Sequence, residues 1–195
     1  MKKMKKPLVL LLTLIMMLAM SAVAWADVTV NFYDEDTQLW TTQTVDPATA
    51  ITARSQFYNE EDYPSATNPC DGKASVLDAI IKAIDQINVS QPVDAKLTFT
   101  TGWSPETVDE KTGAVYPDGF YLNDIYVGTD GQAGYQAYPT ENHYIEGEDG
   151  EPNISYGYGW NGYNGTTAFT AYLSNVALTD NMTINFKYEY YYYEW

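Results

Sequence analysis

Four aromatic side chains separated by glycines are the residues best suited to recognise a ligand. Tyr156, Tyr158, Trp160 and Tyr163 lie among glycines in a stretch that ends at Gly165. Each ring offers a large apolar surface with a polar atom at its rim, which is typical of surfaces that stack on sugars or anchor protein partners. The pattern therefore predicts ligand binding at these four residues. The alternative is that Trp160 and one or two of the tyrosines cover the edge of a sheet.

A cluster of carboxylates precedes these rings and predicts a second kind of site. Glu146, Glu148, Asp149 and Glu151 lie close together in the sequence. Carboxylate oxygens are the ligands that Ca²⁺ prefers in proteins, so these four residues form the hypothesis of a calcium site. Their spacing lacks the alternating Asp and Asn residues of an EF-hand loop. The alternative is a solvated acidic loop.

Residues for nucleophilic or metal-dependent catalysis are few. His143 is the single histidine, so a Ser-His-Asp relay would depend on it, and its neighbours Asn142 and Tyr144 are typical of an exposed loop. Cys70 is the single cysteine, which excludes an internal disulfide. Carboxylates are so numerous that no pair stands out as the two acids of a glycosidase. We expect a binding protein without catalytic activity, and the alternative is an extracellular, carboxylate-dependent glycoside hydrolase.

The first 26 residues have the three parts of a secretory signal peptide. Four lysines come first, an apolar stretch follows from Leu8 to Met20, and Ala24 and Ala26 provide the small residues that signal peptidase requires. The apolar stretch is shorter than the roughly 20 residues of a membrane-spanning helix. We therefore predict a cleaved leader, a single secreted domain over residues 27–195, and no membrane insertion after cleavage.

The predicted secreted domain is strongly acidic. The chain has 10 Lys and Arg against 26 Asp and Glu, and four of the basic residues lie in the leader, so the remaining six leave a net charge of −20. Such a surface repels nucleic-acid phosphates and anionic lipids, which proteins bind with Lys and Arg. Nucleic acid is therefore excluded as a partner. The expected partner is a small molecule, a glycan or a protein outside the cell.

The period of the apolar residues predicts one helix among several strands. Apolar residues recur at helical spacing behind Ser75 and Asp78, which form a capping-box pattern, so we predict a helix over 75–88. Alternation with a period of two predicts strands over 28–33, 39–45, 97–101, 119–127, 167–173 and 181–193. Clusters of Gly, Pro, Asn and charged residues predict loops over 54–72, 105–116 and 135–165. This order predicts an α+β fold, a β-grasp-like mixed sheet covered by one helix, with extra strands and long loops.

Several segments in this order resemble the DUF4430 family. They are Ala74 to Ile80, Gly119 to Ile125, Gly159 to Gly165, and Leu173 to Tyr188. That family is similar to the C-terminal β-domain of transcobalamin and intrinsic factor. The resemblance implies a β-grasp module of an exported bacterial protein, with a corrinoid as one ligand to test.

We predict that the secreted protein begins at Asp27, because Ala24 and Ala26 flank Trp25 at the end of the apolar stretch. The intact mass of material recovered from outside the cell measures this directly. A mass that still includes Met1 to Ala26 would contradict the predicted cleavage.

Overall fold

The structure is a computed structural model that describes most of the chain after the predicted leader. The described residues are 26–54, 70, 73–104, 106–108, 113, 115–148 and 151–194. The leader and nearly all of the predicted loop at 54–72 therefore lie outside the described residues. From that loop, Cys70 is described, and its buried thiol donates a hydrogen bond to the carbonyl oxygen of Ser174 at 3.3 Å.

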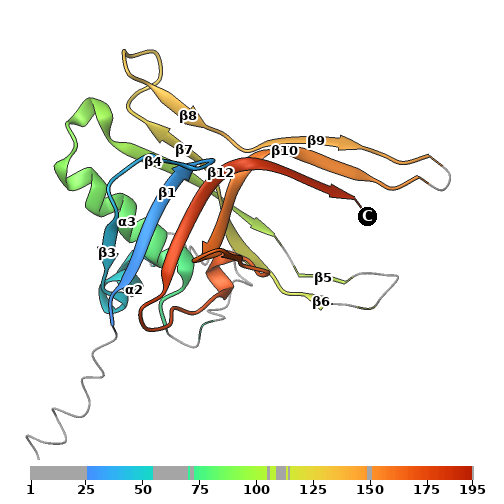
Figure 1. Ribbon diagram of the computed structural model, residues 1–195, viewed down its shortest axis with the longest axis horizontal. Helices are drawn as coiled ribbons and strands as arrows, with labels where there is room; N and C mark the ends of the chain where they lie inside the picture. The colour runs from blue at the N-terminus through green and yellow to red at the C-terminus, as the bar shows by residue number, and fades with distance from the viewer. Residues whose placement is uncertain are drawn as a thin grey trace, which may run out of the picture.

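The main sheet is organised around two parallel central strands. β1 (Val28–Asp34) pairs with β12 (Thr183–Glu194), so that Val30 lies beside Ile184 and Phe32 beside Phe186. β10 (Ile154–Asn164) pairs antiparallel with the other edge of β12 (Figure 1). Short antiparallel strands complete the sheet, and these are β2 (Thr37–Gln38), β3 (Gln43–Val45), β9 (Glu141–Ile145) and β11 (Thr167–Ala168). A first hairpin and a final parallel strand at its side give the predicted β-grasp-like arrangement.

The long helix has the cap and the buried face that the sequence predicts. α3 (Val76–Ser90) begins after Ser75, whose hydroxyl accepts from the Asp78 backbone N–H at 3.2 Å, while the Asp78 carboxylate accepts from the Ser75 backbone N–H at 2.7 Å. These two bonds satisfy donors that a helix N-terminus otherwise leaves open. The apolar face of α3 contacts β1 and β3 of the main sheet. None of the described helices is long and apolar enough to span a bilayer.

A second sheet lies against the same helix. It consists of β4 (Leu97–Ser104), β7 (Gly119–Val127) and β8 (Gln136–Tyr138), with an irregularity between Thr100 and Thr101. α3 contacts both β4 and β7, so the apolar faces of the two sheets share one core with the helix. The largest fully buried side chains include Phe32, Phe186 and Ile80.

Several boundaries differ from the predicted ones. A short helix that the sequence analysis missed, α2 (Pro47–Arg54), follows Asp46, whose carboxylate accepts from the Ala48 N–H at 2.9 Å. The strand predicted over 39–45 is shortened to β3, because residues 39–42 leave the sheet between β2 and β3. The strand predicted over 167–173 ends at Ala168, and a 3₁₀ turn, η2 (Leu173–Asn175), follows.

The predicted loop at 105–116 is wrong where it contains two short strands, and the one at 135–165 is largely wrong. The first contains the hairpin strands β5 (Thr107–Val108) and β6 (Val115–Tyr116), and the second contains β8, β9 and β10. In β10, rings alternate with glycines at 156–160, which is the period of a strand. Glycine is a common loop signal, and this signal hid the alternation in the sequence. β9, β10 and the end of β12 form an arm that extends away from the helix (Figure 1).

We predict that Ile80→Asp unfolds the domain whereas Lys82→Asp leaves it folded. Ile80 is fully buried under the sheet, and a buried unpaired carboxylate costs several kcal/mol against a total stability of about 5–15 kcal/mol. Lys82 lies on the same helix with its side chain only partly buried. Thermal melts of both variants measure the difference, and equal melting temperatures would show that α3 is not the core element.

Candidate functional site

The four predicted aromatic residues all lie on β10, but they do not form one surface. Successive residues of a strand point to opposite faces, so Tyr156, Tyr158 and Trp160 share one face and Tyr163 lies on the other. The register with β12 places Trp160 opposite Tyr188 and Tyr163 opposite Asn185. The predicted surface therefore separates into three environments: the core, the arm, and the outer face of the main sheet.

Trp160 is a core residue and is only 8% exposed. Its indole stacks on Phe186 with centroids 4.8 Å apart, and Phe32 meets it edge-on at 6.4 Å. The indole N–H donates to the carbonyl oxygen of Tyr138 at 3.1 Å, which satisfies the only polar atom of the ring. These contacts agree with the alternative prediction for Trp160, in which the side chain packs against the sheet.

Tyr156 and Tyr158 extend the same face outward along the arm. Tyr156 stacks on His143 of β9 at 5.1 Å, and Tyr158 stacks on Tyr188 at 5.7 Å. His143 is exposed as predicted, but it lies in a strand and not in a loop. Burial, followed by the nearby Glu141 carboxylate, raises the pKa of Tyr188 to about 12, and its hydroxyl donates to the Pro139 carbonyl at 2.8 Å.

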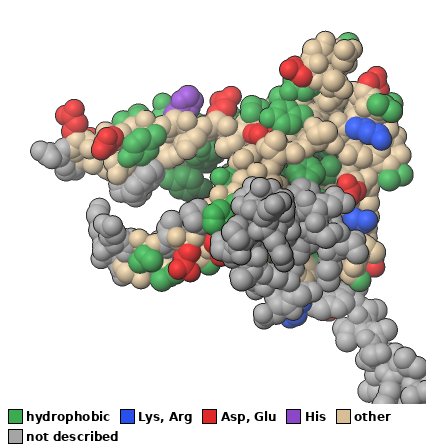
Figure 2. All heavy atoms as spheres, turned by 180° about the vertical axis from the view of Figure 1, so that it is seen from behind, with side chains coloured by type: hydrophobic (Ala, Val, Ile, Leu, Met, Phe, Trp, Pro, Cys, Tyr) green, Lys and Arg blue, Asp and Glu red, His purple; other side chains and the backbone are tan. Residues whose placement is uncertain are grey.

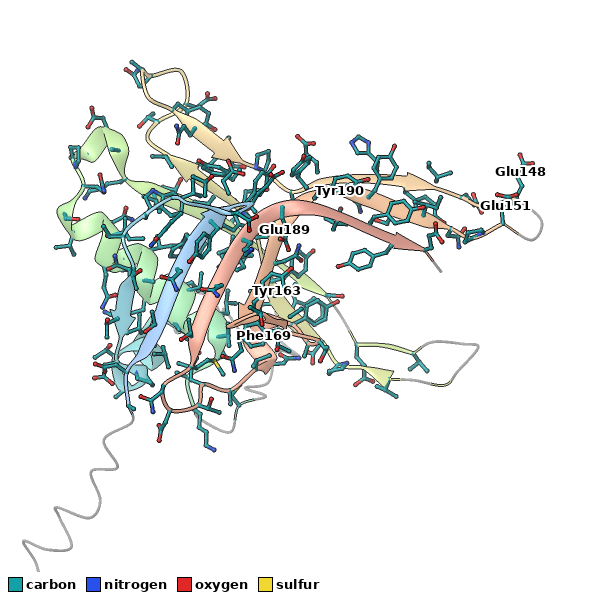
Figure 3. The ribbon with its side chains drawn as sticks, in the orientation of Figure 1. Glu148, Glu151, Tyr163, Phe169, Glu189 and Tyr190 are labelled. Atoms are coloured by element: carbon teal, nitrogen blue, oxygen red, sulfur yellow. The ribbon has the colours of Figure 1, made fainter. Side chains whose placement is uncertain are left out.

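Tyr163 belongs to a polar pocket on the outer face of the main sheet. Its hydroxyl donates to the Glu189 carboxylate, and burial together with that bond raises the pKa of Tyr163 to about 12. Lys187 lies 6.0 Å from the Tyr163 ring and forms an ion pair with Asp36 at 3.0 Å. Tyr163 and Glu189 point toward each other from neighbouring strands (Figure 3). The pocket has a volume of about 340 Å³.

A larger cavity lies at the unpaired middle of β10. β9 pairs with β10 up to Tyr158 and β11 pairs with it from Tyr163, so the edge between these residues is open. A cavity of about 480 Å³ lies against this edge. It is lined by Pro117, Tyr121, Leu122, Trp160, Asn161, Gly162, Phe169, Thr170, Ala171, Tyr172, Leu173 and Tyr193. We call this cavity the aromatic cleft.

The aromatic cleft is bounded by residues from both projections of the molecule. Pro117 follows the β5–β6 hairpin, and Tyr193 belongs to the arm. Figure 2 shows an open hollow between two projections, one of which carries the single histidine of β9. A ligand in the aromatic cleft can therefore extend outward between the hairpin and the arm.

Two glycines allow tyrosine rings to lie flat on the wall of the aromatic cleft. Tyr121 and Tyr172 stack with centroids 6.0 Å apart and an angle of 29° between their planes. A Cβ at Gly102 would lie 2.5 Å from the Tyr121 ring, and a Cβ at Gly119 would lie 2.5 Å from the Tyr172 side chain. Any larger residue at either glycine would displace a ring of this pair.

The lining of the aromatic cleft combines ring surfaces with neutral polar groups. Asn161 and Thr170 offer an amide and a hydroxyl, and none of the lining residues that the structure describes carries a charge. Tyr121, Phe169, Tyr172 and Tyr193 were not among the predicted site residues. Tyr121, Phe169 and Tyr172 have glycines on the segments that face them. The pairing of ring with glycine can be recognised in the sequence only when it is known which strands are partners.

The acidic cluster lies at the tip of the β9–β10 hairpin. Glu148 and Glu151 lie at the end of the arm (Figure 3), where the Glu151 N–H donates to the Glu148 carbonyl at 2.7 Å. Asp149 lies outside the described residues. Among the residues that are described, no group of three His, Cys, Asp or Glu side chains is arranged to hold a metal ion. A calcium site at Glu146, Glu148, Asp149 and Glu151 stays a prediction.

Comparisons with known proteins return no relative of this chain. No protein-family model, no curated protein and no solved structure matches it. The resemblance to the DUF4430 family accordingly stays a prediction.

We predict that Trp160→Ala lowers the free energy of unfolding by about 3–5 kcal/mol, the usual loss for a buried large aromatic residue. Tyr144→Ala on β9 should change it by less than about 0.5 kcal/mol, because Tyr144 is 55% exposed. Chemical denaturation of the two variants measures both values. If the free energy of unfolding fell by a similarly small amount in both variants, Trp160 would not be a core residue.

Proposed function

We propose that this chain is a secreted, non-catalytic binding module that recognises a neutral glycan in the aromatic cleft. The observation that carries the proposal is the described lining of that cleft, in which five aromatic residues accompany an amide and a hydroxyl and none of the described residues is charged. The signal-peptide pattern of the first 26 residues supports a location outside the cell.

Ring faces and neutral polar groups together match the chemistry of a sugar. A pyranose ring has apolar C–H faces that stack on aromatic rings, and hydroxyl groups at its rim that need hydrogen-bond partners. The stacked Tyr121 and Tyr172 offer the first kind of contact, and Asn161 and Thr170 offer the second. The size of the cleft, about 480 Å³, lies within the roughly 300–1,000 Å³ of small-ligand sites.

The charge of the chain favours an uncharged ligand over an anionic one. A net charge of −20 after removal of the leader repels sulfated or uronic-acid-rich glycans. A cationic ligand would find no carboxylate among the described residues that line the aromatic cleft. A polymer of neutral hexoses or neutral amino sugars is not repelled by the negative charge of the chain and needs no carboxylate in the aromatic cleft.

The alternative of a glycoside hydrolase requires a different lining. Such enzymes place two carboxyl groups about 5–9.5 Å apart across the scissile bond. Among the described residues that line the aromatic cleft there is no Asp or Glu. Binding without turnover of the bound glycan is therefore what we propose, and analysis of the glycan recovered after incubation distinguishes the two functions.

We predict that Tyr121→Ala and Tyr193→Ala each weaken glycan binding by about tenfold or more, equivalent to about 1.4 kcal/mol. The two side chains are 37% and 58% exposed, so their removal should leave the thermal melt nearly unchanged. An array of neutral, acidic and basic glycans first identifies the ligand, and cobalamin and cobinamide are included as probes of the corrinoid prediction. Calorimetry then compares the variants.

Tyr144→Ala is the matched control, because it removes a similarly exposed tyrosine on β9 that does not line the aromatic cleft. Unchanged glycan affinity in both cleft variants would contradict the proposed site. Binding of a corrinoid and of no glycan would contradict the proposed ligand class.

A further inference from the structure

The outer edge of β12 is open along the arm. β1 pairs with β12 only as far as Asp34 beside Tyr188, where the Glu35 N–H donates to the Tyr188 carbonyl at 2.8 Å. β12 continues to Glu194, and among the described strands none pairs with this side of residues 189–194. The opposite side of the same residues is paired with β10. Figure 1 shows the end of β12 running outward as the edge of the arm.

The strand register identifies the backbone groups that this edge presents. On the β1 side, the carbonyls of Met182 and Tyr188 accept from Thr29 and Glu35, whereas the Thr183 carbonyl accepts from Gly165 on the β10 side. The N–H and C=O of one residue point to the same side of a strand, and successive residues alternate. The pairing of β10 with β12 continues without a register shift to Glu194. Tyr190 and Tyr192 therefore direct their N–H and C=O groups outward, spaced to pair with an added strand.

Tyrosine rings border this edge on one face of the arm. Tyr190 and Tyr192 are 52% and 49% exposed and lie opposite Tyr158 and Tyr156. On the reverse face, the Tyr191 hydroxyl donates to the Glu141 carbonyl of β9 at 2.9 Å, so this ring extends across β10 and away from the edge. A strand that paired here would place alternate side chains beside Tyr190 and Tyr192.

The charges around the edge select a cationic occupant. Glu189 and Glu194 lie in β12 itself and Glu141 lies in β9, and the three strands of the arm hold a single Lys or Arg, Lys187, which is paired with Asp36. Natural sheet edges are usually protected by outward lysines, and this edge has tyrosines and glutamates instead. Tyrosine faces attract ammonium and guanidinium groups. A second copy of this chain would bring the same acidic edge and the same net charge.

We infer that the outer edge of β12 at 189–194 binds an extended, Lys- or Arg-rich segment of another protein, which adds to the sheet as a strand. Main-chain bonds to Tyr190 and Tyr192 hold the segment, and the rings and carboxylates select its basic side chains. Tyr193 of the same segment lines the aromatic cleft, but Tyr190 and Tyr192, whose backbone groups face outward, do not line it, and the inference does not depend on glycan binding.

Three synthetic peptides test the inference against the whole chain. One alternates Lys with Thr, the second alternates Glu with Thr, and the third has the charge of the first but carries Pro in place of each Thr, which removes half of its N–H donors and holds φ at about −65°, away from the strand conformation. We expect binding of the Lys-Thr peptide, no binding of the Glu-Thr peptide, and about tenfold or greater weakening for the Pro peptide. NMR spectra should show the amide signals of Tyr190 and Tyr192 shifting on binding.

Two variants locate the contact. Tyr192→Pro removes an outward N–H, and the Tyr190→Thr, Tyr192→Thr double variant keeps the strand but removes the rings. Both should reduce Lys-Thr binding about tenfold while the thermal melt and glycan binding persist. Equal binding of the Lys-Thr and Pro peptides would overturn strand addition, since charge alone would then explain the affinity. The wild-type chain would contradict the inference if it associated with itself and Tyr192→Pro abolished that association. The occupant of the edge would then be a second copy of the chain and not a cationic segment.

Discussion

The parallel pairing of β1 with β12 is the constraint on which the other features of the structure depend. It joins segments from the two ends of the described chain and places Phe32 beside Phe186, where both are fully buried. Helix α3 covers the apolar side of this pair, and Trp160 of β10 stacks on Phe186 next to it. β12 is longer than β1, so the residues of β12 beyond the pairing extend past the body of the molecule. Together with β9 and β10, these residues form the arm.

The same arrangement explains why one tyrosine-rich chain has surfaces of different chemistry. Rings on the even-numbered positions of β12 begin in the core at Phe186 and become exposed at Tyr190, with no change of face. The aromatic cleft forms where the partners of β10 leave its middle unpaired, and the rings there come from β7, β12 and the connection after β11. Its neutral lining contrasts with the acidity of the chain as a whole, so a ligand can be drawn to either surface by a different interaction.

Local signals predicted the parts of the fold that local physics determines. The helix at 75–88 was predictable because its capping box and its apolar period agree, and the strand at 119–127 has the predicted bounds. The stretch at 135–165 was misjudged because its glycines resemble loop signals. In the folded chain, glycines such as Gly102 and Gly119 make room for rings from other segments, a role that depends on tertiary neighbours.

The candidate site was predictable only in part for the same reason. Of the four predicted aromatic residues, Trp160 lines the aromatic cleft from its core position, while Tyr156, Tyr158 and Tyr163 lie elsewhere. Tyr121, Phe169 and Tyr193 are far apart in the sequence, and no spacing rule brings them together. Their convergence follows from the pairing of β10 with β12 and from the position of β7 beside them.

The most direct test of the central claim is a two-dimensional NMR titration of the chain with a neutral glycan selected from the array. We expect the signals that shift to be the amides of Asn161 and Thr170, the neighbours of Tyr121 and Tyr172, and the indole N–H of Trp160, because these groups line or adjoin the aromatic cleft. Shifts confined to the acidic tip near Glu148 or to the polar pocket around Lys187 would contradict the account.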